Sequence, residues 1–366
     1  MTDEFEPQRT SLNADEIHAR LSEWIKDKVE DDNASISSFS RPSGSGMSSE
    51  TLLFESSWGK GESETNKQLV ARLAPTSQDI PVFPKYDLSS QVKIMKLVEK
   101  STNIKVPKVV WLEQSSDILG TPFFVMERIH GRVPPDIPPY VFGGWLYDAN
   151  TEDQIRLQQS CVEIIAQLSQ IKLNSVDTEF LEVNVQGKTS LERHFANQKD
   201  YYNWVIKGSR QHTVIERAFE WLESNWPKES DTVVSWGDAR IGNIMFDNMS
   251  YEPVAVLDWE MAGLAPVEVD LGWMIFMHKF FQVIAEALEF PGMPNFMMSS
   301  DVTSTFEELT GIIPENIEWF EIYAATRHAI IMSRINDRSV HFGESEWTKD
   351  VDSSIPHRDY LWSRIR

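Results

Sequence analysis

The most informative stretch of this sequence is Ser235-Trp-Gly-Asp-Ala-Arg-Ile-Gly-Asn-Ile-Met-Phe-Asp247, and Val254-Ala-Val-Leu-Asp-Trp-Glu260 follows it closely. Short apolar runs at 233–236, 244–246 and 254–257 predict strands, and the last two can pair as a hairpin that turns at 248–250. Asp238 and Asn243 stand five residues apart in a loop that contains glycine. Because the hairpin returns the chain, Asp258 can join them. We therefore expect three oxygen-bearing side chains to converge.

This set of side chains suits a hard cation. Mg2+ takes oxygen ligands, needs only one or two from the protein, and completes its shell with water and phosphate. Asn243 and Asp258 are the candidate ligands, and Asp238 would remain free to accept the proton of a substrate hydroxyl. That division of roles predicts phosphoryl transfer. Isolated Asp and Asn residues at strand ends more often form turns, so the prediction depends on the rest of the pattern.

The remainder of the chain consists of two parts that differ in their predicted secondary structure. Helical periodicity at 13–28 and 88–99 is combined with short runs that predict strands, at 36–39, 51–54, 68–73, 108–112 and 123–129. Beyond Gly131 and a proline-rich stretch, most segments are helical in period, such as 154–171, 214–226, 267–288 and 317–335. We expect an α+β, bilobal fold, with a small antiparallel-sheet lobe over residues 1–129 and a mostly helical lobe over residues 130–366.

With these motifs the chain resembles the aminoglycoside phosphotransferase-like family, and within it a bacterial branch described only as phosphotransferases. The resemblance runs through nearly the whole chain and implies a protein-kinase-like fold. It implies that 236–243 is the catalytic loop with Asp238 as the base, that 258–260 is the metal-binding motif, and that Asp270 braces the loop. Arg240 would stabilise the transferring phosphoryl group or pair with a carboxylate. Glu260 would contact the metal or the substrate.

The same resemblance assigns a nucleotide site to the first lobe. The turn at 44–49 would cover the phosphates, because small residues let backbone N–H groups approach phosphate oxygens; taken alone, it is an ordinary flexible turn. Arg72 would grip the phosphates, and the backbone at the end of the strand 123–129 would hold adenine. The expected nucleotide-binding residues are Gly44, Gly46, Ser48, Ser49, Arg72, Glu127 and Ile129. The expected cofactors are ATP or GTP, with Mg2+.

Three residues depart from the common pattern of the family. Arg72 replaces a lysine, Gln91 replaces the glutamate that would pair with it, and Trp236 replaces a histidine before Gly-Asp. These departures keep open the alternative of a catalytically silent nucleotide-binding module, whereas the retained Asp238, with its two candidate metal ligands, favours an enzyme. The candidate acceptors are an aminoglycoside, a hydroxyacyl thioester, a choline-like alcohol and a sugar.

Composition narrows the choice of partners. The net charge of −22 disfavours nucleic acid and anionic membrane surfaces. No apolar run approaches the roughly 20 residues of a membrane span, and residues 1–10 are polar and acidic, so we expect a cytoplasmic protein. Cys161 is the single cysteine, and it lies on an apolar stripe with helical spacing. The sequence Gly187-Lys-Thr-Ser looks like the end of a phosphate-binding loop, but its context predicts the start of a helix.

Overall fold

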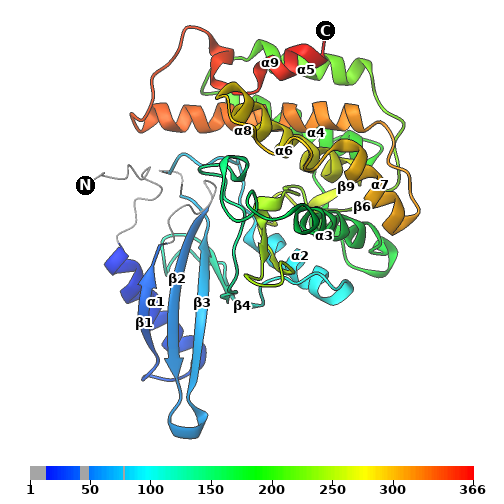
Figure 1. Ribbon diagram of the computed structural model, residues 1–366. Coiled ribbons are helices and arrows are strands. Elements are labelled where there is room, and N and C mark those ends of the chain that lie inside the picture. Colours follow the sequence, from blue (N-terminus) through cyan, green and yellow to red (C-terminus); the bar gives the residue numbers. More distant parts are fainter. Residues whose placement is uncertain (1–13, 42–48, 77–78) are drawn as a thin grey trace. The chain divides into compact units, whose positions relative to one another are not determined.

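The computed structural model describes residues 14–41, 49–76 and 79–366. These residues form two compact units (Figure 1). Unit 1 contains the described residues up to 96, together with 107–129 and 341–344, and unit 2 contains 97–106, 130–340 and 345–366. The predicted α+β class is confirmed, because an antiparallel sheet dominates unit 1 and helices dominate unit 2. None of the helices described combines the length and the apolar character that crossing a membrane requires.

Unit 1 is built on a five-stranded antiparallel sheet in the order β1-β2-β3-β5-β4. The strands are β1 (Ser35–Ser40), β2 (Glu50–Trp58), β3 (Thr65–Leu73), β4 (Val109–Glu113) and β5 (Phe123–Glu127). Helix α1 (Ala14–Val29) packs its buried Leu21, Trp24 and Ile25 into one apolar cluster with strand residues such as Phe54 and Phe123. One stripe of the helix thus covers the inward-facing alternate residues of the strands. Helix α2 (Leu88–Ser101) leads from unit 1 into unit 2.

Unit 2 is mostly helical. Its longer helices are α3 (Thr151–Ser169), α4 (Ser190–Ile206), α5 (Thr213–Ser224), α6 (Glu268–Ala287), α7 (Ser299–Thr310) and α8 (Ile317–His341), and the short α9 (Arg358–Arg364) follows. Helix α6 is the central one, since its first ten residues are all buried, and six of its twenty side chains are Trp, Met or Phe. Two small antiparallel pairs interrupt the helices, β6 (Thr232–Ser235) with β9 (Gly263–Pro266) and β7 (Ile244–Phe246) with β8 (Pro253–Val256).

The structure confirms the predicted hairpin of β7 and β8. Its turn is held by Asp247, whose carboxylate accepts hydrogen bonds from the backbone N–H groups of Met249 and Ser250 at 2.9 and 2.8 Å. The helix expected near Gly187 is α4, and Thr189 caps it by accepting a hydrogen bond from the backbone N–H of Glu192 at 3.1 Å. Strand β9 was not predicted, because Gly-Leu-Ala-Pro has no alternation and becomes a strand only by pairing with β6.

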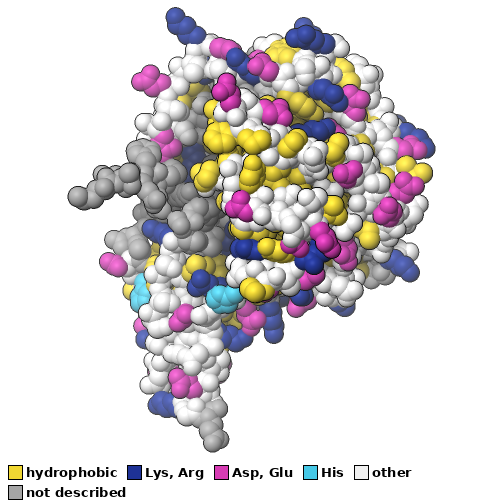
Figure 2. All heavy atoms as spheres, in the orientation of Figure 1, with side chains coloured by type: hydrophobic (Ala, Val, Ile, Leu, Met, Phe, Trp, Pro, Cys, Tyr) yellow, Lys and Arg dark blue, Asp and Glu magenta, His cyan; other side chains and the backbone are white. Residues whose placement is uncertain are grey.

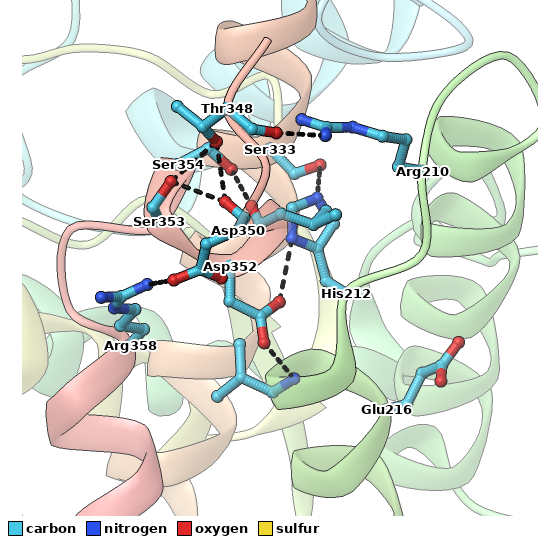
Figure 3. Close-up of polar contacts among 12 residues, drawn as sticks. Arg210, His212, Glu216, Ser333, Thr348, Asp350, Asp352, Ser353, Ser354 and Arg358 are labelled. Atoms are coloured by element: carbon cyan, nitrogen blue, oxygen red, sulfur yellow. Dashed lines mark hydrogen bonds and ion pairs between the residues drawn. The ribbon is translucent and has the colours of Figure 1, made fainter.

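The C-terminal segment, for which the sequence predicted no element, is attached to the rest of unit 2 by polar contacts (Figure 3). His212, just before α5, lies between Ser333 of α8 and Asp352, with Nε2–Oγ at 2.8 Å and Nδ1–Oδ1 at 3.3 Å. The second oxygen of Asp352 accepts a hydrogen bond of 3.2 Å from the backbone N–H of Val214. Asp352 therefore caps the first turn of α5 from a distant part of the chain.

Candidate active site

The loop 236–243 connects β6 to β7 in unit 2, and its backbone is fixed from α6. Asp270, near the N-terminus of α6, accepts hydrogen bonds from the backbone N–H groups of Trp236 and Gly237, at 2.8 and 2.9 Å, and from Oγ of Ser235 at 2.8 Å. Burial raises the pKa of Asp270 even though these three donors act in the opposite direction. Gly237 has φ +86°, and a Cβ there would collide with the carbonyl oxygen of Met261, so only glycine fits.

Asp238 follows this fixed turn, and three side chains orient its carboxylate. Oδ2 accepts hydrogen bonds from Nδ2 of Asn243 at 2.6 Å and from Nε of Arg240 at 3.2 Å. Oδ1 accepts a hydrogen bond of 2.7 Å from Nε1 of Trp273. The Asp238 side chain keeps 17% of its surface exposed. The structure thus brings together three of the predicted residues, in a geometry that leaves the carboxylate accessible.

Arg240 bridges two carboxylates. Besides its contact with Asp238, its Nη1 lies 2.6 Å from Oδ2 of Asp136, which is in the loop before α3. Burial disfavours the charge, but Asp238 and Asp136 outweigh it and raise the pKa of Arg240 above its usual value. The guanidinium therefore remains a fixed positive charge beside Asp238. Pairing with carboxylates, one of the two roles predicted for Arg240, is realised in this geometry.

Asp258 is connected to the loop through the hairpin. The backbone N–H of Leu257 donates to the carbonyl of Asn243 at 2.8 Å, and the indole of Trp236 donates to the carbonyl of Leu257 at 2.9 Å. Trp236 thus supports the loop through a hydrogen-bond donor. Asp258 has φ +54°, a left-handed conformation that is uncommon for a residue with a side chain. Its carboxylate also helps to raise the pKa of Arg240.

The oxygen atoms near the hairpin fit a Mg2+ ion that shares its shell with other ligands. Because the amide nitrogen of Asn243 is used on Asp238, its Oδ1 is the atom that remains for a cation. Asp258 supplies a carboxylate, and Glu260 is half-buried directly after the buried Trp259. Among the residues described, no group of three or more His, Cys, Asp or Glu could hold a metal ion. The set suits an ion that completes its shell with water and phosphate.

The predicted nucleotide-binding residues that the structure describes belong to unit 1. Gly44, Gly46 and Ser48 lie outside the described residues, and Ser49 is buried just before β2. Arg72 lies in β3 opposite Thr51 and Phe124, and its Nη1 lies 3.4 Å from Oγ1 of Thr51.

Glu127 ends β5. Its backbone N–H donates to the carbonyl of Lys108 at 2.9 Å, and its carboxylate pairs with Lys67. Ile129 follows two residues later and is half-buried.

Sequence reasoning missed three residues that surround the loop. Asp136 holds Arg240, Trp273 holds Asp238, and Arg327 of α8 donates from Nη2 to the carbonyl of Gly237 at 3.0 Å. The sequence carries a recognisable pattern for two of these residues, Trp273 and Arg327. Trp273 stands three residues after Asp270, on the same face of one helix. Arg327 lies in a mostly apolar stretch of α8, which is typical of a buried charge with a specific partner.

Comparison with known proteins identifies the family. A model described as "Phosphotransferase enzyme family" matches residues 44–290. The chain is 29% identical over 217 residues to mouse acyl-CoA dehydrogenase family member 10, a match that covers 57% of this chain and only 18% of that protein.

Two solved structures share the fold. One is a Ralstonia eutropha protein assigned to the aminoglycoside phosphotransferases, with a TM-score of 0.66, 18% identity, and coverage of 95% of this chain and 97% of that one. The other is a thermostable mutant of aminoglycoside phosphotransferase APH(4)-Ia in a ternary complex with ADP and hygromycin B, with a TM-score of 0.53, 14% identity, and coverage of 92% and 98%. Since the family model covers more than half of its length, this chain belongs to the phosphotransferase enzyme family.

Proposed function

We propose that this chain transfers the γ-phosphoryl group of ATP to a hydroxyl group of a small molecule, in a reaction that depends on Mg2+. The observation that carries this proposal is the environment of Asp238. Its carboxylate is oriented by Asn243, Arg240 and Trp273 and still has 17% of its surface exposed. A general base needs such exposure, because it must reach the proton that it accepts.

In the proposed reaction, Asp238 accepts the hydroxyl proton as the oxygen of the acceptor forms a bond to the γ-phosphorus. The bond from that phosphorus to the β–γ bridging oxygen breaks, and ADP leaves. Arg240 places a positive charge next to the base, where it would stabilise the transferring group. Asn243 and Asp258 would hold Mg2+, with Glu260 as a further contact to the metal or the substrate. When bound, Mg2+ supplies neutralisation of phosphate charge.

Nucleotide binding is proposed for the residues of unit 1. Arg72 would grip the phosphates bidentately, as an arginine can. The turn at 44–49 would cover the phosphates, and the backbone of Glu127 and Ile129 would hold adenine. The ADP named for the APH(4)-Ia complex supports a nucleotide cosubstrate. ATP is proposed as the phosphoryl donor, and GTP is the alternative donor.

For the acceptor, we propose an alcohol with an apolar, acyl-like body rather than a polycationic aminoglycoside. A cavity of about 10 Å3 next to the catalytic loop in unit 2 reaches Arg240 and Gly242 and is otherwise lined mainly by apolar side chains, including Met274, Met277 and Phe281. It has room for about one water molecule, so it indicates the apolar character of this side of the loop and is not itself the acceptor pocket. Hydrophobic side chains also gather on the face around α6 (Figure 2). Methionine side chains adapt readily to an apolar ligand. The mouse relative named as an acyl-CoA dehydrogenase supports a hydroxyacyl thioester.

The test is an acceptor panel with ATP or GTP and Mg2+, containing short- and medium-chain hydroxyacyl-CoA thioesters, choline, a hexose and an aminoglycoside. Product is detected by mass spectrometry, and Asp238→Asn serves as the control because it keeps the shape of the side chain and removes the base. We expect a phosphorylated hydroxyacyl product that the variant does not form. Nucleotide binding without any Asp238-dependent product would favour a silent nucleotide-binding module, and transfer only to the aminoglycoside would overturn the proposed acceptor.

A further inference from the structure

We propose that Trp273 and Arg327 form a positioning pair that sets the orientation of the Asp238 carboxylate for proton transfer. This inference rests on the proposed function, in which Asp238 is the base. Trp273 belongs to α6 and Arg327 to α8, and neither residue belongs to the loop or to the metal-binding motif. Both are positioning residues, since each acts on the reaction only through Asp238 or the backbone before it.

The two oxygens of the Asp238 carboxylate accept hydrogen bonds from different sets of donors. Among the residues that the structure describes, two donate to Oδ2, Asn243 and Arg240, and one donates to Oδ1, the indole N–H of Trp273 at 2.7 Å. A carboxylate oxygen has two lone-pair positions. The Trp273 bond occupies one position on Oδ1 and leaves the other for the proton of the substrate. Because the indole is a donor and never an acceptor, it cannot compete for that proton.

Burial and helix packing hold the indole of Trp273 in one position. The Trp273 side chain is buried, with 2% of its surface exposed. The preceding residue, Gly272, lets α6 and α8 approach closely, because a Cβ there would lie 2.7 Å from the carbonyl carbon of Phe320. Packing between the two helices thus holds the ring in one place. A donor fixed in this way can define the plane of the carboxylate.

A buried cation, the guanidinium of Arg327, lies beside the ring of Trp273. The Cζ of Arg327 lies 4.5 Å from the centroid of the Trp273 ring, and the residue is 1% exposed. Within the described part of the chain, its Nε and Nη1 have no hydrogen-bond partner, and only Nη2 donates, to the carbonyl of Gly237. Burial lowers the pKa of Arg327, while Tyr323, Asp270 and Asp238 oppose that shift.

A guanidinium with so few hydrogen bonds is costly to bury. This cost indicates that the position of Arg327 has a functional role. Over the indole face it draws electron density from the ring, and the N–H that points at Asp238 becomes a stronger donor. Through Nη2 it also restrains the peptide group directly before Asp238. Arg327 therefore acts on both the side chain and the backbone of the proposed base.

The experiment compares Trp273→Phe with Trp319→Phe. Trp319 is 4% exposed, and its indole N–H donates to the carbonyl of Leu222 at 3.1 Å, so this variant loses an equivalent buried bond away from Asp238. The probe reaction is hydrolysis of Mg-ATP, in which water takes the place of the alcohol. We expect kcat to fall about 10- to 100-fold in Trp273→Phe with KM for ATP within about twofold of the parent. Trp319→Phe should retain the parent kcat.

A second readout does not depend on turnover. In the 15N-indole spectrum of the full chain, the Trp273 resonance is identified by its absence in Trp273→Phe. Asp238→Asn should shift that resonance and leave the Trp319 resonance in place. An unchanged Trp273 resonance, or a parental kcat in an active Trp273→Phe, would overturn the proposal. A parent protein without Asp238-dependent turnover would instead refute the proposed function, and the spectrum would still decide whether the indole reports on Asp238.

Discussion

Nη1 of Arg240 donates a hydrogen bond of 2.6 Å to Oδ2 of Asp136, which lies 104 residues earlier in the chain. The same guanidinium donates from Nε to Asp238. One planar group thus joins the proposed base to a loop before α3, and both contacts use the fork of the guanidinium. A lysine at this position could not reproduce both contacts in the same way.

We therefore predict that Asp136→Asn lowers kcat/KM of the phosphotransferase reaction by about 3- to 10-fold, because Arg240 loses one of the charges that hold it. Arg240→Lys should lower it further, by about 10²-fold or more, since the fork is lost. Steady-state kinetics measure both changes. The control is Glu220→Gln, which breaks an ion pair with Arg217 in which both side chains are more than 60% exposed. A parental rate in Arg240→Lys would show that the fork plays no part.

Asp270→Asn is predicted to destabilise the fold and the catalytic loop together. The substitution replaces one acceptor oxygen by an NH2 group that must face a buried N–H or O–H donor. Leaving such groups unsatisfied costs about 2–4 kcal/mol. Ser235→Ala removes only one of the three donors and should cost about 1 kcal/mol. Urea unfolding measures both, and equal losses in the two variants would contradict this account of Asp270.

Gly237→Ala is predicted to cost more stability than Gly311→Ala. Both glycines have positive φ, +86° and +73°, so both substitutions strain the backbone, by roughly 1 kcal/mol. A Cβ at Gly311 meets no atom within 4 Å, whereas one at Gly237 collides with the backbone of Met261. The difference between the two variants in thermal unfolding isolates that collision. If both variants unfold at the same temperature, the loop can move away from Met261 at no cost.

The protein is predicted to lose stability between about pH 6.5 and pH 4. Burial lowers the pKa of His278 and of His357 to about 4 from a usual value of 6.5. As the pH falls through this window, the unfolded chain takes up protons before the folded one does, so the free energy of unfolding decreases. At pH 5 each histidine should account for about 1–2 kcal/mol. Above pH 6.5 both states are neutral at these positions, and the two histidines cause no change.

Urea midpoints at pH 7, 6 and 5 test this prediction. Burial also lowers the pKa of His194, His212 and His328, which contribute in the same direction. The variant His278→Asn removes one of these titrating groups and should show a smaller decrease between pH 7 and pH 5 than the parent. Asp270 acts in the opposite direction, because its raised pKa gives the folded state a greater affinity for protons than the unfolded chain. A midpoint that does not change with pH would contradict the assigned direction of the histidine shifts.

Asp352→Ala is predicted to loosen the C-terminal segment. The variant loses the contact with His212 and the hydrogen bond to the backbone N–H of Val214 (Figure 3). The loss of a cap of this kind costs about 1–2 kcal/mol. Asp350→Ala is the matched control, because Asp350 is 61% exposed and its pair with Arg358 lies at the surface. Hydrogen exchange over 345–366 should increase in the first variant and remain near the parent in the second.

The sequence by itself determined the architecture and the residues proposed for the chemistry. Short apolar runs and helical periods are local properties, and they located most strands and helices to within a few residues. The motif around Asp238 could be recognised because the base and its partner Asn243 are only five positions apart. The hairpin of β7 and β8 then connected Asp258 to them through local turn chemistry at Asp247.

Only the tertiary structure decided what surrounds the carboxylate of Asp238. Asp136, Trp273 and Arg327 come from three distant segments, and the directions of their side chains depend on how α6 packs against α8 and on how the loop before α3 returns to Arg240. No short-range pattern encodes such contacts, since each residue alone looks like a turn carboxylate, a core aromatic or a misplaced charge. Their roles follow from the tertiary packing. Burial removes water, so each polar group depends on the protein partner that lies next to it.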